Sequence, residues 1–171
     1  VSTGAIILGR KAHYNLYHDS LTNLPNRRSF LKEIRLIKKI NPYTSRHLVA
    51  ILFLNLDRFK MINKGLSQQA GDFLLVETAK RLQKILKNHE KMARVGGDEF
   101  AIWLSNVQNI DEVTHLANLL QEQLRQPLKW DDQEIFSSVS IGIALERIDS
   151  LLGGEELLRH AHIARYRAKD K

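Results

Sequence analysis

Hydrophobic positions along the chain switch between two spacings. Residues 29–40 and 71–86 carry apolar side chains at helical spacing, which predicts two amphipathic helices. Between them, residues 48–56 form a continuous apolar run interrupted only by Asn55. This run predicts a strand that is buried on both faces of a sheet.

The second half of the chain continues the alternation, with one interruption. Residues 91–95 and 100–104 predict two short strands joined as a hairpin, and a strand over 135–144 lies between helices predicted over 111–124 and 155–169. The order helix, strand, helix, hairpin, helix, strand, helix predicts an α/β (α+β) fold. We expect a mixed, mainly antiparallel central sheet of about five strands, surrounded by helices, with a ferredoxin-like core.

Length and composition limit the class of protein. The chain has 171 residues, which suits one domain, and 43% of them are hydrophobic, enough for a packed core. We expect residues 1–18 to form an N-terminal linker or signalling helix ahead of a domain over 19–171. Cysteine is absent, so disulfides and thiolate metal sites are excluded, and a metal would need oxygen or imidazole ligands. No apolar run is long enough to span a bilayer.

The net charge of the chain does not by itself identify a partner. A net charge of +7 suits polyanionic partners in general or a solvated basic surface. No basic patch interleaved with aromatic residues appears, which argues against nucleic acid as a partner.

The hairpin tip, Gly96-Gly97-Asp98-Glu99, is the most distinctive chemical feature. Two glycines permit positive φ and leave room for a phosphate or ribose close to the backbone. Two adjacent carboxylates offer the oxygen ligands that Mg²⁺ prefers. The alternative is an ordinary hairpin whose tip is polar because it is solvated.

Two further pairs of polar residues are candidates. Asn55 and Asp57 lie at the end of the buried strand, where alternation puts them on one face. An Asp there is as often a strand terminator as a metal ligand. Asn63 and Asp72 have an amide and a carboxylate that can bind a guanine edge. The alternative is that Asn63 ends a turn and that Asp72 caps the next helix, and capping does not exclude binding.

Taken together, the motifs resemble the GGDEF family, the diguanylate cyclases. The resemblance covers the chain from about Asp19 to its end. It rests on the segments Asp19-x-Leu21-Thr22-x-Leu24-x-Asn26-Arg27, Phe59-Lys60-x-Ile62-Asn63, Gly71-Asp72, Arg94-Val95-Gly96-Gly97-Asp98-Glu99-Phe100, Ser140-Ile141-Gly142 and Ala164-x-Tyr166-x-Ala168-Lys169.

This resemblance implies an activity and a setting. Two domains would meet as a homodimer, each holding one GTP with Mg²⁺ or Mn²⁺, and condense two GTP into cyclic di-GMP and pyrophosphate. The fold would be similar to the palm of nucleotide cyclases and polymerases. We expect a cytoplasmic domain within a longer protein, flanked by sensor or EAL domains, or both.

The resemblance also assigns roles by position. Asp98 would be the catalytic, metal-binding carboxylate, with Glu99 beside it. Asn55 and the main-chain carbonyl of Leu56 would complete the metal ligands. The substrate-binding residues would be Asn63 and Asp72 for guanine, Lys60 and Lys169 for phosphates, and the glycines Gly96 and Gly97.

The sequence departs from the family at important positions. Asn55 stands where active members carry Asp, and a neutral amide should weaken the metal site. Whether Asp57 compensates is left open. Lys87 and Glu90 occupy the place of the Arg-x-x-Asp product-inhibition site. Lys lacks the bidentate fork of Arg, so we expect this site to be degenerate and product feedback to be weak.

Three hypotheses therefore stand side by side. The first is a diguanylate cyclase, with activity weakened by Asn55. The second is a catalytically silent, GTP-binding regulatory domain that controls an adjacent phosphodiesterase or effector domain. The third is an interaction module that no longer binds nucleotide. The presence of Asn63, Asp72, Lys60 and Asp98 argues against the third, whereas Asn55 argues against full activity.

Overall fold

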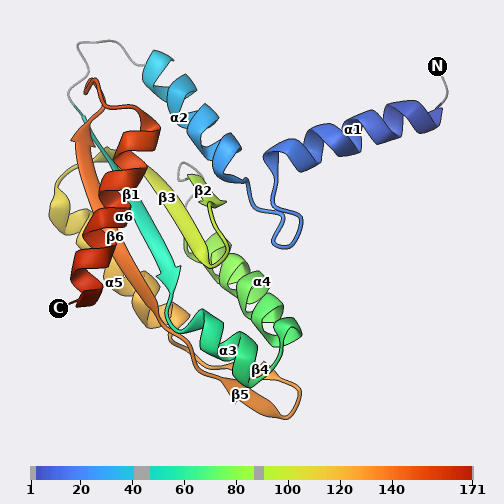
Figure 1. The fold of residues 1–171 in the computed structure, drawn as a ribbon. Helices are drawn as coiled ribbons and strands as arrows, with labels where there is room; N and C mark the ends of the chain where they lie inside the picture. Colours follow the sequence, from blue (N-terminus) through green and yellow to red (C-terminus); the bar gives the residue numbers. More distant parts are fainter. Residues whose placement is uncertain (1–2, 41–46, 87–90, 171) are drawn as a thin grey trace.

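A computed structural model describes residues 3–40, 47–86 and 91–170, with the side chains of 3–8 and 165–170 left out of the description. Figure 1 shows the arrangement of its elements. The helices are α1 Thr3–Tyr17, α2 Arg27–Ile40, α3 Phe59–Gly65, α4 Gln68–Ile85, α5 Ile110–Leu124 and α6 Gly154–Asp170. The strands are β1 Leu48–Leu56, β2 Lys91–Arg94, β3 Glu99–Val107, β4 Leu128–Trp130, β5 Gln133–Ile135 and β6 Val139–Arg147.

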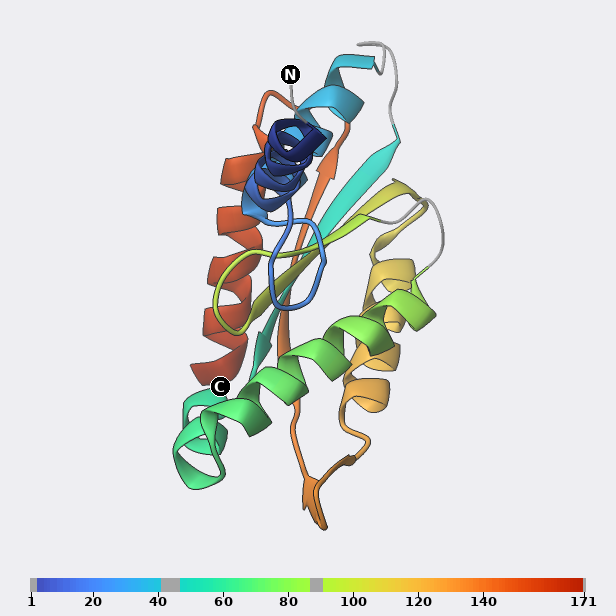
Figure 2. The same cartoon turned by 90° about the vertical axis from the view of Figure 1, so that its right-hand side faces the viewer.

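The centre of the molecule is a four-stranded sheet with the order β2-β3-β1-β6. Each neighbouring pair is antiparallel. Helices α4 and α5 cover one face of the sheet, and α2 and α6 cover the other (Figures 1 and 2). The predicted fold class, a mainly antiparallel sheet surrounded by helices, is confirmed.

Strand β1 explains why residues 48–56 are almost uniformly apolar. Alternate side chains of a strand point to opposite faces. Leu52 and Leu54 pack in the core under α4 and α5, whereas Ile51 and Phe53 pack in the core under α2 and α6. Every residue of β1 after Leu48 is buried. The prediction of a strand buried on both faces is therefore confirmed.

The predicted strand over 135–144 is in fact two strands. Ile135 pairs with Leu128 in the separate β4–β5 hairpin, whereas β6 begins at Val139, which pairs with Leu56 of β1. The chain turns between them at 136–138, and Phe136 is 68% exposed. The central sheet of the described residues consequently has four strands rather than about five.

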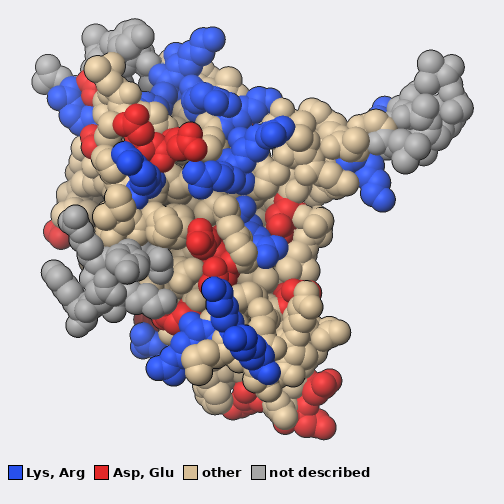
Figure 3. Space-filling model, viewed as in Figure 1, with Lys and Arg blue, Asp and Glu red and all other residues tan. Residues whose placement is uncertain are grey.

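Helices α1 and α2 differ in how they contact the rest of the domain. Helix α1 projects from the body (Figure 1), whereas α2 buries Phe30 and Ile34 against the sheet. The outer face of α2 is rich in Lys and Arg, and Figure 3 shows these basic side chains gathered over it. Within the described part of the chain, no helix is both long and apolar enough to cross a membrane.

Candidate functional site

The tip of the β2–β3 hairpin contains Gly96, Gly97, Asp98 and Glu99. Its base is closed by the Val95 N–H, which donates to the Glu99 carbonyl at 2.9 Å. The expected positive φ is wrong, because no glycine in the described residues has one. A Cβ on Gly96 would lie 2.8 Å from Oε2 of Glu99, so that carboxylate would have to move. A Cβ on Gly97 would meet nothing within 4 Å, so space is open beside it.

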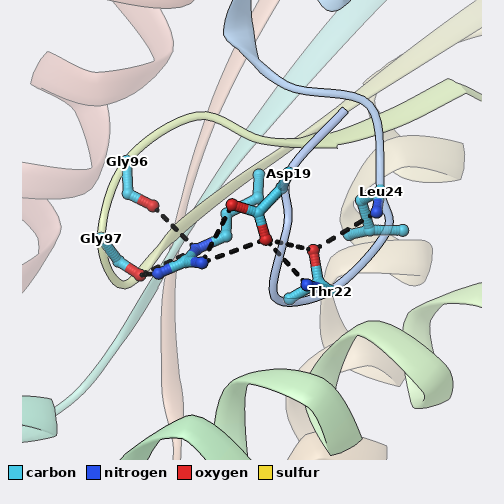
Figure 4. A network of polar contacts seen from close by, with 6 residues as sticks. Asp19, Thr22, Leu24, Gly96 and Gly97 are labelled. Carbon is cyan, nitrogen blue, oxygen red and sulfur yellow. Dashed lines mark hydrogen bonds and ion pairs between the residues drawn. The ribbon is translucent and has the colours of Figure 1, made fainter. Parts of the chain in front are cut away.

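The backbone of the tip is held instead by hydrogen bonds from Arg94. Figure 4 shows the two glycines and Asp19, which the hydrogen bonds of Arg94 link. Nε of Arg94 donates to the carbonyls of Gly96 at 3.2 Å and Gly97 at 3.1 Å, and Nη2 donates to Gly97 at 2.7 Å. Nη1 donates to both carboxylate oxygens of Asp19, each at 3.0 Å. One guanidinium thus joins the hairpin to a segment 75 residues earlier.

Asp19 is itself fixed by its own turn. Its Oδ2 accepts from the N–H and from the Oγ1 hydroxyl of Thr22, both at 2.8 Å. Burial acts to raise the pKa of Asp19, but the Thr22 hydrogen bonds and the Arg94 guanidinium together hold it below its ordinary value. Asp19 therefore carries its negative charge throughout the neutral range.

The end of β1 lies directly beside the hairpin. Asn55 pairs with Glu99 on one side and with Ser140 on the other, and it is 8% exposed. The carbonyl of Asp98 accepts from the Leu56 N–H at 3.0 Å and from Nδ2 of Asn55 at 3.4 Å. The structure therefore brings together the four residues that the sequence proposes as metal ligands.

The chemistry of these donors fits a divalent ion only in part. Among the described residues, no group of three His, Cys, Asp or Glu side chains could hold a metal. Asp98 and Glu99 supply carboxylates, while Asn55 turns its Nδ2 donor toward the Asp98 carbonyl. A divalent ion here would need further oxygens, and the phosphates of a nucleotide are suitable ones.

Asp57 does not share this environment. Its two carboxylate oxygens accept from the hydroxyls of Ser138 at 2.7 Å and Ser140 at 2.6 Å. Its N–H also donates to the Ser138 carbonyl at 2.9 Å. Asp57 thus fastens the start of β6 to the end of β1, and it lines a pocket of about 890 Å³ together with Arg58 and Phe136. These contacts explain its position without a metal.

Asn63 and Gly71 meet where α3 packs against α4. A Cβ on Gly71 would lie 1.7 Å from Oδ1 of Asn63, so only glycine leaves room for this amide. Oδ1 of Asn63 is buried and has no hydrogen-bond partner among the described residues. Asp72 follows Gly71 directly, which puts a carboxylate-bearing residue next to a buried, unpaired acceptor.

The predicted capping role of Asp72 is wrong. Helix α4 begins at Gln68, and its N-cap is Ser67, whose Oγ accepts from the Ala70 N–H at 3.1 Å. Asp72 is therefore already inside the helix. The cap lies five residues before Asp72, because the helix begins ahead of its apolar stripe.

The remaining predicted residues are less closely defined. Lys60 is exposed in α3. Lys169 lies within α6, but its side chain falls outside the described residues, as do Lys87 and Glu90 entirely. The sequence also pointed to Asp19 and Arg94 only as parts of motifs and assigned neither a role, although both lie in the network of the hairpin.

Comparison with known proteins gives one consistent result. Residues 16–171 match the family described as "Diguanylate cyclase, GGDEF domain". The chain is 38% identical over 164 residues to the signaling protein YkoW of Bacillus subtilis, covering 95% of this chain. It is 36% identical over 160 residues to the diguanylate cyclase TpbB of Pseudomonas aeruginosa, covering 91% of this chain.

A solved structure agrees. The crystal structure of a sensory box/GGDEF family protein from Caulobacter crescentus has a TM-score of 0.78 and 34% identity, covering 90% of this chain and 98% of that one. The curated relatives are much longer, since the chain spans 20% of the length of YkoW and 36% of TpbB.

Proposed function

Because the chain belongs to the GGDEF family, the diguanylate cyclase domains of cyclic-di-GMP signalling, we propose that it binds GTP and condenses two GTP molecules into cyclic di-GMP and pyrophosphate. The corner between α3 and α4 binds the guanine base. The hairpin tip and the end of β1 hold the phosphate end of the same nucleotide. Asn55 weakens the catalytic step.

The buried Oδ1 of Asn63 is the observation that carries this proposal. An unpaired buried acceptor costs roughly 1–3 kcal/mol, so a ligand that donates to it gains binding free energy. Guanine has donors at N1 and N2, which suit the Asn63 oxygen and the Asp72 carboxylate. A base that presents an acceptor there would leave the Asn63 oxygen unpaired and would bind less well.

The phosphate end has different requirements. Lys60 and Lys169 supply positive charge, and the open space beside Gly97 lets phosphate approach the backbone. Diguanylate cyclases of this family generally use a divalent metal. Asp98, Glu99 and the Leu56 carbonyl would hold Mg²⁺ or Mn²⁺ here. When bound, the ion would neutralise charge on the triphosphate.

Asn55 favours a second candidate, a GTP-binding domain with little or no catalysis. The amide brings no negative charge, and it already donates to the Asp98 carbonyl. Such a domain would regulate an adjacent phosphodiesterase or effector domain. The weakened cyclase remains the main proposal, because both hairpin carboxylates are present.

The setting of the domain follows from this chemistry. Each nucleotide's 3′-hydroxyl would attack the α-phosphate of the other, so two copies of the domain must meet as a homodimer. Since GTP is the substrate, the domain would act in the cytoplasm. Because the curated relatives are several times longer, we propose that flanking sensor or EAL domains belong to the same chain.

The assay that tests this proposal incubates the protein with GTP and Mg²⁺ or Mn²⁺ and measures cyclic di-GMP and pyrophosphate. We expect slow formation of both by the wild-type protein. Asn55→Asp should raise the rate about tenfold or more and tighten Mg²⁺ binding in the presence of GTP, because it restores an anionic ligand. Asp98→Asn should abolish the activity.

Asn55→Asp should also lower the stability of the protein, because it removes the hydrogen bond from Asn55 to the Asp98 carbonyl. A carboxylate at position 55 cannot donate to the Asp98 carbonyl, so Asn55→Asp should melt lower without metal and recover with Mg²⁺ and GTP. Unchanged metal affinity and unchanged product formation in Asn55→Asp would refute the role of this residue. No product from either protein, with GTP still bound, would support the silent regulatory domain.

A further inference from the structure

The outer face of helix α2 carries a concentration of positive charge. Four exposed basic residues recur along it at helical spacing: Arg28, Lys32, Arg35 and Lys39. This spacing puts them on one face of the helix, away from the side that is buried against the sheet. Figure 3 shows Lys and Arg side chains gathered over α2, and Glu33 is the one acidic residue of the helix. We call these four residues the basic stripe.

Neighbouring carboxylates do not neutralise the basic stripe. Among the residues that the structure describes, none of its four members takes part in an ion pair. Lys32 lies over the Tyr17 ring, 4.6 Å from its centroid, and this contact leaves the charge of the ammonium in place. Glu155, at the start of α6, is paired with Arg27 instead, at 3.3 Å. The stripe therefore presents its charge to a partner outside the domain.

Large apolar side chains are exposed at the C-terminal end of the same helix. Leu36 is 46% exposed and Ile40 is 80% exposed, and Leu151, in the loop before α6, is 100% exposed. Each of these side chains would gain free energy by leaving water for an apolar environment. They stand beside basic residues rather than together in one continuous apolar patch.

The loop that carries Leu151 is fastened to α2. Nζ of Lys38 donates to the Ser150 carbonyl at 2.9 Å and to the Leu152 carbonyl. Lys39 and Leu151 line the same hollow of about 310 Å³ between the helix and this loop. The exposed leucine and the end of the basic stripe thus belong to one surface.

This combination of charge and apolar side chains fits a bilayer that contains anionic lipids. Lipid headgroups attract clustered Lys and Arg, and the boundary with the acyl chains accepts apolar side chains such as Ile40 and Leu151. Single-stranded nucleic acid needs aromatic side chains for stacking, and the basic stripe contains none. The core of a protein–protein interface is apolar and depleted in charge, whereas here basic residues occupy the centre of the face.

We propose that the basic stripe, together with Ile40 and Leu151 at its end, binds the surface of a bilayer that contains anionic lipids. The basic side chains contact the headgroups, and the two apolar side chains enter the boundary with the acyl chains. Helix α2 covers the face of the sheet opposite to α4, so this contact leaves the corner between α3 and α4 open (Figures 1 and 2). The inference goes beyond the proposed function and does not depend on nucleotide.

Sedimentation of the full chain with vesicles, in the absence of nucleotide, tests the proposal. One set of vesicles contains equal parts of phosphatidylglycerol, which is anionic, and phosphatidylcholine, and the other contains phosphatidylcholine alone. We expect binding to the anionic vesicles to be tighter by about tenfold or more at low salt. Most of this difference should disappear at high salt, because ions screen the attraction.

The basic stripe is tested by combining Arg28→Gln, Arg35→Gln and Lys39→Gln. Lys32 is kept because it contacts Tyr17. Each basic side chain near an anionic surface strengthens binding about fivefold, so the affinity for anionic vesicles should fall about a hundredfold. The melting temperature should match wild type, because the three altered side chains are exposed.

The matched control combines Lys64→Gln, Lys84→Gln and Lys129→Gln. These lysines are exposed on α3, α4 and β4, so the control loses the same positive charge from other surfaces. Its affinity for anionic vesicles should fall less than about threefold, because these side chains lie away from the bilayer.

The apolar contact is tested by combining Ile40→Ser with Leu151→Ser. The affinity for anionic vesicles should fall about tenfold, because both side chains lose their transfer into an apolar environment. The chain has no cysteine, so Leu151→Cys also provides a single site for a polarity-sensitive fluorophore. Its emission should shift to the blue with anionic vesicles. The same dye attached through Asp132→Cys, between β4 and β5, should not shift.

Several outcomes would overturn the proposal. Absence of binding to anionic vesicles, or equal binding to phosphatidylcholine alone, would do so. Equal losses in the stripe variant and its matched control would show that only net charge matters. Full binding after Ile40→Ser with Leu151→Ser, together with equally tight binding to soluble polyglutamate, would indicate an acidic protein as the partner. GTP binding without vesicle binding would keep the proposed function and refute this inference alone.

Discussion

The hairpin tip and the corner between α3 and α4 differ in whether the protein itself satisfies their hydrogen-bond acceptors. At the tip, the carbonyls of Gly96, Gly97 and Asp98 all accept hydrogen bonds from the protein. At the corner, the buried Oδ1 of Asn63 has no partner in the described residues. The protein's own donors thus hold the tip, whereas the corner has an acceptor, free among the described residues, that a ligand pairs with in the proposed function. We therefore expect the two regions to respond to different substitutions.

Arg94→Ala should lower the free energy of unfolding most, because it removes the hydrogen bonds that hold the backbone of the hairpin tip. It removes the cationic partner of the partly buried Asp19 carboxylate and the side-chain donors to the Gly96 and Gly97 carbonyls. We expect a loss of about 2–3 kcal/mol in the free energy of unfolding. The measurement is urea denaturation, in which the midpoint should fall while the slope stays constant.

The control for this change is Arg147→Ala, which breaks an exposed ion pair. Its effect should stay within about 0.5 kcal/mol. If Arg94→Ala and Arg147→Ala lower the free energy of unfolding equally, the contacts of Arg94 stabilise the protein no more than an exposed ion pair does.

Gly71→Ala tests the corner and should have a smaller effect on stability. Alanine normally stabilises a helix by about 1 kcal/mol relative to glycine. Here the new Cβ would lie 1.7 Å from Oδ1 of Asn63, so the amide must move and that gain is lost. We expect a net loss of about 1 kcal/mol and a much smaller rise of the melting temperature with GTP.

Gly65→Ala is the matched control, since a Cβ there meets nothing within 4 Å. It should be neutral or slightly stabilising and should keep the full response to GTP. A normal GTP response in Gly71→Ala would show that the position of Asn63 does not matter for binding.

The strands show what the sequence could and could not predict. The bounds of β1 followed from its apolar run, because helices cover both faces of the sheet. The break between β5 and β6 did not, because it follows from pairing: Ile135 pairs with Leu128, whereas Val139 pairs with Leu56. Local pattern carries no information about such distant partners.

The same limit applies to the site. Asn63, Asp72, Asp98 and Glu99 could be selected from motifs, and their neighbours in space follow from the fold. The pair between Arg94 and Asp19 could not be predicted from local pattern, since it joins positions 75 residues apart in the chain. The expected positive φ at the glycines is wrong, and their carbonyls instead accept hydrogen bonds from the Arg94 side chain.

Acid should weaken the tip by a small, predictable amount. The pKa of Asp19 in the folded protein is held below its ordinary value of 3.8. A depressed pKa contributes stability that is present above pH 3.8 and is lost as the pH falls through the lower, folded value. Wild type should therefore lose more stability than Asp19→Asn below pH 3.8. Parallel curves for the two proteins in that range would show that Asp19 does not titrate as described.

The central claim is that the unpaired Asn63 oxygen recognises guanine, and thermal unfolding with nucleotides tests it most directly. A ligand at about 100 times its Kd stabilises a protein by about 2.7 kcal/mol, which corresponds to several degrees in Tm. We predict that GTP raises the Tm of the wild-type protein by this much, that ATP raises it far less, and that Asn63→Ala removes the difference. Equal shifts with GTP and ATP, or no shift with GTP, would contradict the account.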